Sequence, residues 1–85
     1  MKTVILSTSP YMNQSYEQGI EVALNLAEAS QAVQVIMVGD FEQAYFNANS
    51  QAIFKKKLKQ LALFDVPCLS SKDVHAHIDD GVLNF

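Results

Sequence analysis

The chain has 85 residues, of which 49% are hydrophobic, and a formal net charge of −3 at pH 7. This length accommodates a single domain, 1–85, and the apolar content is that of a globular protein, which excludes a disordered chain. All 6 basic residues are lysines, so the acidic, arginine-free composition disfavours direct binding of nucleic acid. Because a domain of this size buries little surface alone, we expect it to form a homo- or hetero-oligomer.

No segment approaches the run of roughly 20 apolar residues that a membrane span requires, and the apolar run at the N-terminus is too short for a signal peptide. The single cysteine, Cys68, has no partner for an intramolecular disulfide. We therefore expect a cytoplasmic protein without membrane association, in which the thiol stays reduced.

The first part of the chain predicts a strand, a helix and a strand. Residues 3–8 form a β-branched apolar run, which is typical of a strand buried on both faces. Residues 15–27 carry apolar side chains at intervals of three and four, which predicts an amphipathic helix with Asn13 or Ser15 as its cap. Residues 33–39 predict a second buried strand. This order is a βαβ unit, so the two strands should be parallel and joined by a right-handed crossover.

The second part of the chain predicts shorter elements. They are a helix over 41–46, an amphipathic helix over 53–64, a strand over 65–69, a helical turn containing Val74 and Ile78, and a strand over 82–85. Pro67 suggests a strand start or an edge position, because proline cannot donate to a β-ladder. Gly19 weakens the first helix and so indicates a close approach by a neighbouring element. Together these elements predict an α/β fold, a flavodoxin-like three-layer α/β/α sandwich with a mainly parallel sheet.

Ligands of such sheets bind beyond the carboxyl ends of the strands. The first of these segments contains Ser7, Thr8, Ser9 and Asn13 ahead of a helix, so its backbone N–H groups could hold an anion. The segment lacks the glycines of a Rossmann or Walker loop, and ordinary loop and capping chemistry is the competing interpretation. Asp40 follows the second strand and could bind Mg²⁺ or simply occupy a turn.

Cys68 is the second candidate. If a helix begins near Ser71, the sulfur lies just ahead of its amide donors, with Ser70 and Lys72 close by. Both the helix start and the lysine would favour the thiolate, a form suited to sulfur exchange. The competing interpretation is a small buried apolar residue, which is a common role of free cysteine.

Two charged clusters complete the candidates. The first is the lysine run Lys55, Lys56, Lys57 and Lys59, which is either a solvated helix face or a local site for an acidic partner. The second contains His75, His77, Asp79 and Asp80. Residues two apart on a helix point away from each other, so we do not expect a metal site. We also expect no cofactor.

The order of several segments resembles the DsrE/DsrF family of sulfur-relay proteins, and most closely its DsrF/TusC branch. The segments are Val4 to Pro10, Gly19 to Leu24, Val35 to Asp40, and Phe54 to Val66. Members of that branch share a strand ending in Ser-Thr-x-Pro and a late helix that runs into a Leu-Tyr/Phe-Asp-Ile/Val step, here Leu63-Phe64-Asp65-Val66. The chain departs from the pattern around Pro67-Cys68, where it is shorter, and lacks the arginine-glycine ending of the following helix.

The resemblance implies a flavodoxin-like subunit that assembles with other DsrE-family subunits and receives sulfur through a sulfur-donor protein. Such complexes transfer persulfide sulfur in tRNA 2-thiouridine synthesis or act in sulfur oxidation. Cys68 is the residue that matches the sulfur acceptor of the DsrE/TusD branch, whereas TusC-like subunits are partners of the carrier. The sequence thus leaves a persulfide carrier and a noncatalytic subunit open. The alternative from another class is a flavodoxin-like small-molecule or anion-binding module using the Ser7–Ser15 loop.

Overall fold

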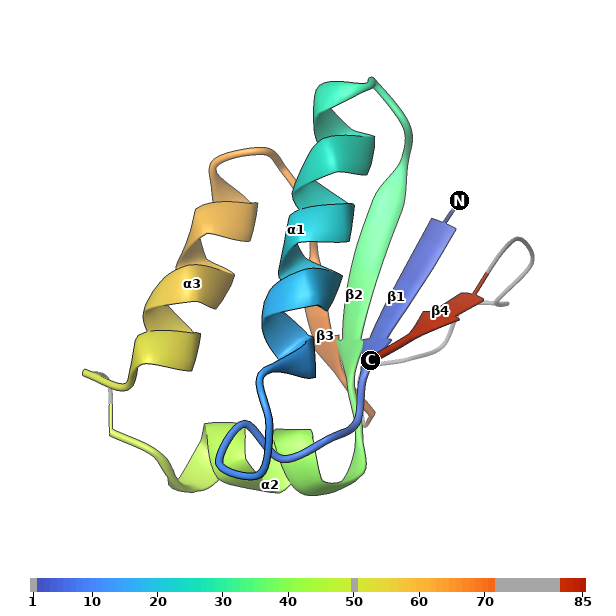
Figure 1. Cartoon of the computed structure of the whole chain (residues 1–85). Coiled ribbons are helices and arrows are strands. Elements are labelled where there is room, and N and C mark those ends of the chain that lie inside the picture. The colour runs from blue at the N-terminus through green and yellow to red at the C-terminus, as the bar shows by residue number, and fades with distance from the viewer. Residues whose placement is uncertain (1, 50, 72–81) are drawn as a thin grey trace.

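The computed structural model describes residues 2–49, 51–71 and 82–85 (Figure 1). The elements in chain order are β1 (Lys2–Leu6), α1 (Ser15–Glu28), β2 (Val33–Met37), α2 (Gly39–Asn47), α3 (Ile53–Ala62), β3 (Cys68–Ser70) and β4 (Val82–Asn84). These ranges match the elements predicted from the sequence, with shifts of a few residues at their ends. The predicted helical turn containing Val74 and Ile78 lies outside the described residues.

The four strands form one parallel sheet in the order β3-β2-β1-β4. In its register Val4 lies beside Val35, and Val35 lies beside Cys68. The predicted fold class, an α/β fold with a parallel sheet arranged as a small flavodoxin-like sandwich, is confirmed. β3 is an edge strand that begins directly after Pro67, as the missing N–H of that residue requires.

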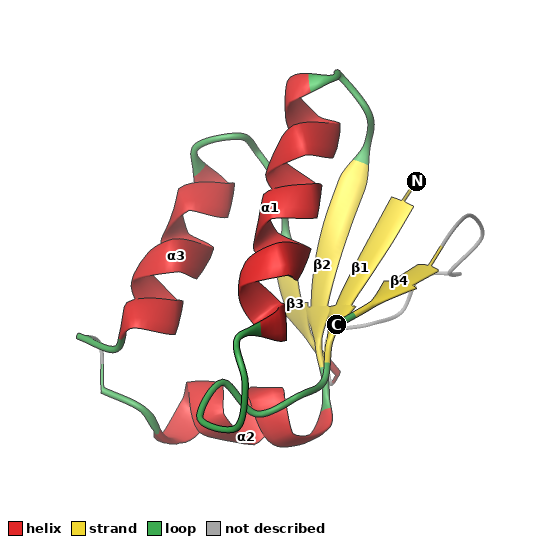
Figure 2. Ribbon diagram, in the orientation of Figure 1, coloured by secondary structure: helices red, strands yellow, loops and turns green. Residues whose placement is uncertain are grey.

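Helices α1 and α3 lie side by side on one face of the sheet, and α2 crosses near the carboxyl ends of the strands (Figure 2). Alternate strand residues join the buried side chains of these helices in the core, because successive side chains of a strand point to opposite faces. The strand residues of the core are Val4, Leu6, Val33, Val35, Met37 and, partly buried, Cys68. None of the helices described has both the length and the hydropathy of a membrane span.

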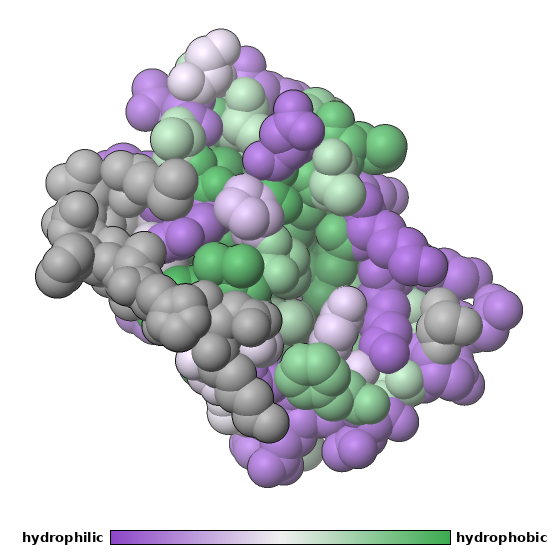
Figure 3. All heavy atoms as spheres, turned by 180° about the vertical axis from the view of Figure 1, so that it is seen from behind, coloured by the Kyte–Doolittle hydropathy of each residue, from purple (hydrophilic) through white to green (hydrophobic). Residues whose placement is uncertain are grey.

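The intervening residues of the two central strands face the other side of the sheet. Thr3, Gln34 and Ile36 are buried there. The side-chain amide of Gln34 donates a hydrogen bond of 3.0 Å to the hydroxyl of Thr3. Figure 3 shows the molecule from this side, with apolar side chains gathered between polar margins.

Gly19 marks the contact between α1 and β1. A Cβ atom at this position would lie 2.6 Å from Cδ2 of Leu6 and 3.1 Å from the ring of Phe85. The close approach indicated by a glycine inside the helix is therefore present, and it lets α1 lie directly on the sheet.

Candidate functional site

The loop after β1 lies where the winding of the sheet reverses, because β2 and β4 flank β1 on opposite sides. Open α/β sheets bind ligands at this position. However, the N–H groups of Ser7 and Thr8 donate to the main-chain oxygen of Phe85 at 3.1 and 3.4 Å. The two amides that the sequence offered to an anion are therefore engaged within the protein.

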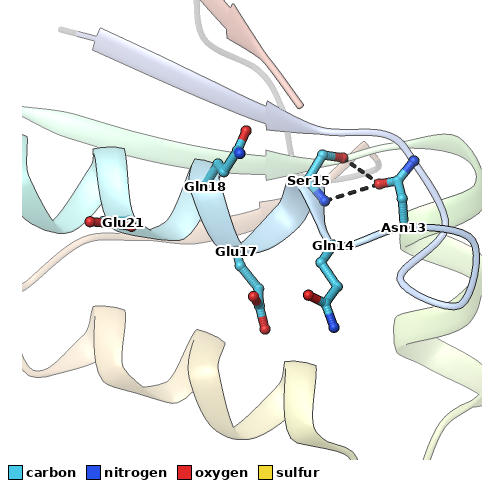
Figure 4. Close-up of a pocket in the computed structure, with 6 residues that line it drawn as sticks. All are labelled: Asn13, Gln14, Ser15, Glu17, Gln18 and Glu21. Carbon is cyan, nitrogen blue, oxygen red and sulfur yellow. Dashed lines mark hydrogen bonds between the residues drawn. The ribbon is translucent and has the colours of Figure 1, made fainter.

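Ser9 and Asn13 hold the rest of this loop in place. The hydroxyl oxygen of Ser9 accepts a hydrogen bond of 3.2 Å from the N–H of Tyr11. The side-chain oxygen of Asn13 accepts bonds from the N–H and the hydroxyl of Ser15, at 3.0 and 2.7 Å (Figure 4). Asn13 thus supports the turn that leads into α1. The N-cap residue is Gln14, which makes no side-chain cap bond, so the prediction of Asn13 or Ser15 as the cap is wrong.

A hollow of about 380 Å³ lies beside the start of α1. Its lining is polar and consists of Asn13, Gln14, Ser15, Glu17, Gln18 and Glu21 (Figure 4). Figure 4 shows the carboxylate of Glu17 pointing toward α3, where it pairs with the ammonium of Lys57. Of the two carboxylates in the lining, Glu17 is neutralised by Lys57, and the charge of Glu21 repels an anion. The contacts of the Ser7–Ser15 loop therefore do not favour the nucleotide or anion-binding alternative.

Cys68 is the first residue of β3, so the prediction that it lies at the carboxyl end of a strand over 65–69 is wrong. Pro67 explains the difference, because it offers the ladder only its carbonyl, which accepts a bond of 2.9 Å from the N–H of Val35. The Cys68 side chain packs against the core, and its burial raises the pKa of the thiol from 9.0 to about 11. The expected thiolate is thus disfavoured, and the contacts are those of a small apolar residue.

The donors expected to stabilise a thiolate lie at the other end of β3 and serve a carboxylate instead. Ser71 donates its N–H to Oε2 of Glu42 at 2.6 Å and its hydroxyl to both carboxylate oxygens at 2.9 Å. Ser70, the last residue of β3, is buried beside Met37, and Lys72 lies outside the described residues.

Glu42 was not among the candidates named from the sequence. It lies in the first turn of α2, together with the exposed Asp40. Asp40 is therefore the second residue of a helix and not a turn residue. The only sign of Glu42 in the sequence was an acidic residue soon after the second predicted strand. Only the pairing of β2 with β3 brings that residue to Ser71.

No metal site is formed within residues 2–49, 51–71 and 82–85, where no three His, Cys, Asp or Glu side chains are close enough to share an ion. The cluster named from the sequence, His75, His77, Asp79 and Asp80, lies outside those ranges.

An aromatic cluster that was not predicted from the sequence lies at the carboxyl ends of the strands. The rings of Phe41 of α2, Tyr16 of α1 and Phe54 of α3 contact one another. Their centroids are 5.7 Å (Tyr16–Phe41), 5.8 Å (Phe41–Phe54) and 6.2 Å (Tyr16–Phe54) apart. Tyr11 extends the cluster outward through an edge-on contact of 5.8 Å with Phe54. The spacing of each helix identified its own apolar face, but the meeting of the rings depends on how the three helices pack.

The fold and this arrangement define a small parallel α/β protein whose one thiol is packed into the core side of an edge strand. Comparisons with protein-family models, curated proteins and solved structures give no match to the chain.

Proposed function

We propose that the protein is a noncatalytic partner subunit of a cytoplasmic sulfur-relay complex, of the DsrF/TusC kind that its sequence resembles. The observation that carries the choice between carrier and partner is the state of Cys68. A persulfide acceptor must attack the donor's outer sulfur as a thiolate, but burial raises the pKa of this thiol to about 11. A neutral thiol packed against Val35 and its neighbours stabilises the subunit and leaves sulfur transfer to another chain.

Two further features support the proposal. The parallel α/β fold is the one that the resemblance implies. In addition, several large apolar side chains are exposed, as expected of a subunit that buries them against partners. They are Tyr11, Met12, Phe46, Ile53, Leu63, Phe64, Val82 and Leu83.

Assembly and sulfur transfer are tested together. The chain is co-expressed with the products of its neighbouring genes and analysed by size-exclusion chromatography. The purified complex is then treated with a persulfide-loaded cysteine desulfurase, and each subunit is weighed by intact-mass spectrometry. We expect one stable complex in which added sulfur appears on a partner and not on Cys68, and in which Cys68→Ser transfers sulfur normally.

Other outcomes decide between the alternatives. Added sulfur on Cys68, lost together with relay activity in Cys68→Ser, would establish the carrier role instead. Elution as a monomer that binds none of the co-expressed proteins would contradict the subunit proposal. Thermal stabilisation by a nucleotide or by inorganic phosphate would support the anion-binding module, because a ligand that binds only the folded state raises its stability by mass action.

A further inference from the structure

The largest of the described hollows is a groove between the loop after β1 and the first turn of α3. Its volume is about 480 Å³, which is within the range of roughly 300–1,000 Å³ typical of ligand pockets. The side chains that matter for its chemistry are Tyr11, Tyr16, Glu17, Ile53, Phe54 and Lys57.

The walls of the groove are apolar and its rim is exposed. Phe54 is buried at its base and contacts Tyr11 edge-on, while 72% of Tyr11 and 67% of Ile53 are accessible to solvent. Exposed aromatic and aliphatic side chains around a preformed hollow are typical of sites that bind an apolar anchor residue.

The charges within the groove cancel. Lys57 forms an ion pair with Glu17 and lies 5.9 Å from the centre of the Tyr16 ring. Lys55 is half-buried, and its ammonium donates to the carbonyl of Ala48 at 2.7 Å. Neither lysine is therefore available to a partner without breaking an existing contact.

The charges beside the groove do not cancel. Lys56 is exposed on α3 and lies one turn from Ile53 on the same face of the helix. Lys59, also exposed, is in the last turn of α3 and lies away from the groove. The first turn of α3 contains no acidic residue, so the positive end of the helix dipole adds to the charge of Lys56. A protein with a net charge of −3 thus presents a local positive patch next to an apolar groove.

We propose that this groove docks an acidic segment of a partner protein, with an aromatic or aliphatic side chain seated against Tyr11 and Phe54 and a carboxylate facing Lys56 and the first turn of α3. A protein partner fits better than a nucleic acid, because the chain has no arginine for phosphate contacts and the rim offers apolar side chains. The docking surface is independent of the role of Cys68, so it goes beyond the proposed function and stands if that function fails.

A defined peptide tests the proposal by fluorescence anisotropy with the full chain. The probe is a fluorescein-labelled peptide of sequence Glu-Asp-Leu-Phe-Asp-Glu. One comparison peptide replaces the acidic residues with Gln and Asn, and another replaces Leu-Phe with Gly-Gly. We expect saturable binding of the probe, weakened roughly tenfold or more by either replacement, since both the charge and the anchor contribute.

Variants locate the binding on the groove. Lys56→Glu should weaken binding roughly three- to fivefold, the effect of one exposed charge pair, and Ile53→Ser should weaken it at least as much. Lys2→Glu, which makes the same charge change at the amino end of β1, is the matched control and should bind as the wild type does. Both groove positions are exposed, and unchanged denaturation midpoints would show that the variants fold.

Three results would overturn the proposal. They are the absence of saturable binding, an equal loss in Lys2→Glu and Lys56→Glu, and tighter binding of a single-stranded oligonucleotide than of the acidic peptide. The last result would assign the lysines to nucleic acid.

Discussion

The side-chain amide of Gln34 donates to the hydroxyl of Thr3 at 3.0 Å, across the pairing of the two central strands. Both residues are buried, and they occupy one pair of the β1–β2 register, Thr3 beside Gln34. A polar pair in the middle of the sheet is tolerated because each group supplies the other's partner.

Thr3→Val should lower the free energy of unfolding by about 1–3 kcal/mol, because it leaves the buried amide of Gln34 without this acceptor. The double variant Thr3→Val/Gln34→Leu should recover much of the loss, since both polar groups are then removed. Urea denaturation followed by circular dichroism measures both. Thr3→Ser retains the hydroxyl and is the control, and a double variant as unstable as the single one would contradict this account.

Gly19→Ala should destabilise the protein by about 1 kcal/mol. The added methyl group meets Cδ2 of the fully buried Leu6 at 2.6 Å, and the cost of overpacking exceeds the gain in helix propensity. The same substitution in a Leu6→Val background should cost less stability, because valine lacks the Cδ2 methyl group that the added Cβ atom would meet. Additive effects of the two substitutions in thermal or urea unfolding would show that the contact does not limit the packing of α1.

Alkylation of Cys68 should report a thiol that ionises far above neutral pH. Its pKa of about 11, against an ordinary 9.0, makes the thiolate at pH 8 roughly a hundredfold scarcer than in the unfolded chain. Iodoacetamide should therefore react slowly with the folded protein, at a rate that rises up to about pH 11. The urea-unfolded chain is the control. An apparent pKa at or below 9 would contradict the buried thiol and favour the carrier role.

The same shift makes stability depend on pH. Since the folded-state pKa of Cys68 lies above its unfolded value, the contribution is fully present below about pH 9 and is lost as the pH rises through 11. For a half-buried group the loss should be about 1–2 kcal/mol. Cys68→Ala should lack this component while sharing the titration of every lysine and tyrosine. Identical pH profiles of the two proteins would rule the contribution out.

Loss of the Glu42 contact should loosen the end of β3. Glu42→Gln removes the negative charge that strengthens the surface bonds of 2.6–2.9 Å, and Ser71→Ala removes the two hydroxyl bonds of 2.9 Å but keeps the main-chain N–H bond. Each should lower the free energy of unfolding by about 1 kcal/mol. Because the residues act as one pair, the double variant should cost little more than either single one. Glu28→Gln, at an exposed position of α1, is the charge-matched control. Fully additive losses of stability would show that Glu42 and Ser71 contribute independently and would contradict the pairing.

Much of the architecture followed from local patterns. The continuous apolar runs of β1 and β2 and the three- and four-residue spacing in α1 and α3 predicted elements that the structure contains. A strand buried on both faces is apolar throughout, whereas a helix buried on one face is apolar at intervals of three and four residues. Pro67 also fixed the start of β3 locally, through its missing N–H. The predicted bounds of β3 were wrong by only a few residues, yet this difference places Cys68 at the opposite end of its strand.

By itself, the sequence determined the α/β class, the order of its elements and the close approach at Gly19, since each depends on the shape or spacing of neighbouring residues. Only the tertiary structure decided the chemistry of the candidate site. The N–H groups of Ser7 and Thr8 donate to the main-chain oxygen of Phe85, and the donors of Ser71 bind the carboxylate of Glu42. The side chain of Cys68 packs against the hydrophobic core. Each of these partners is distant in the sequence, and a group's pKa or free hydrogen-bonding capacity depends on what packs against it in space.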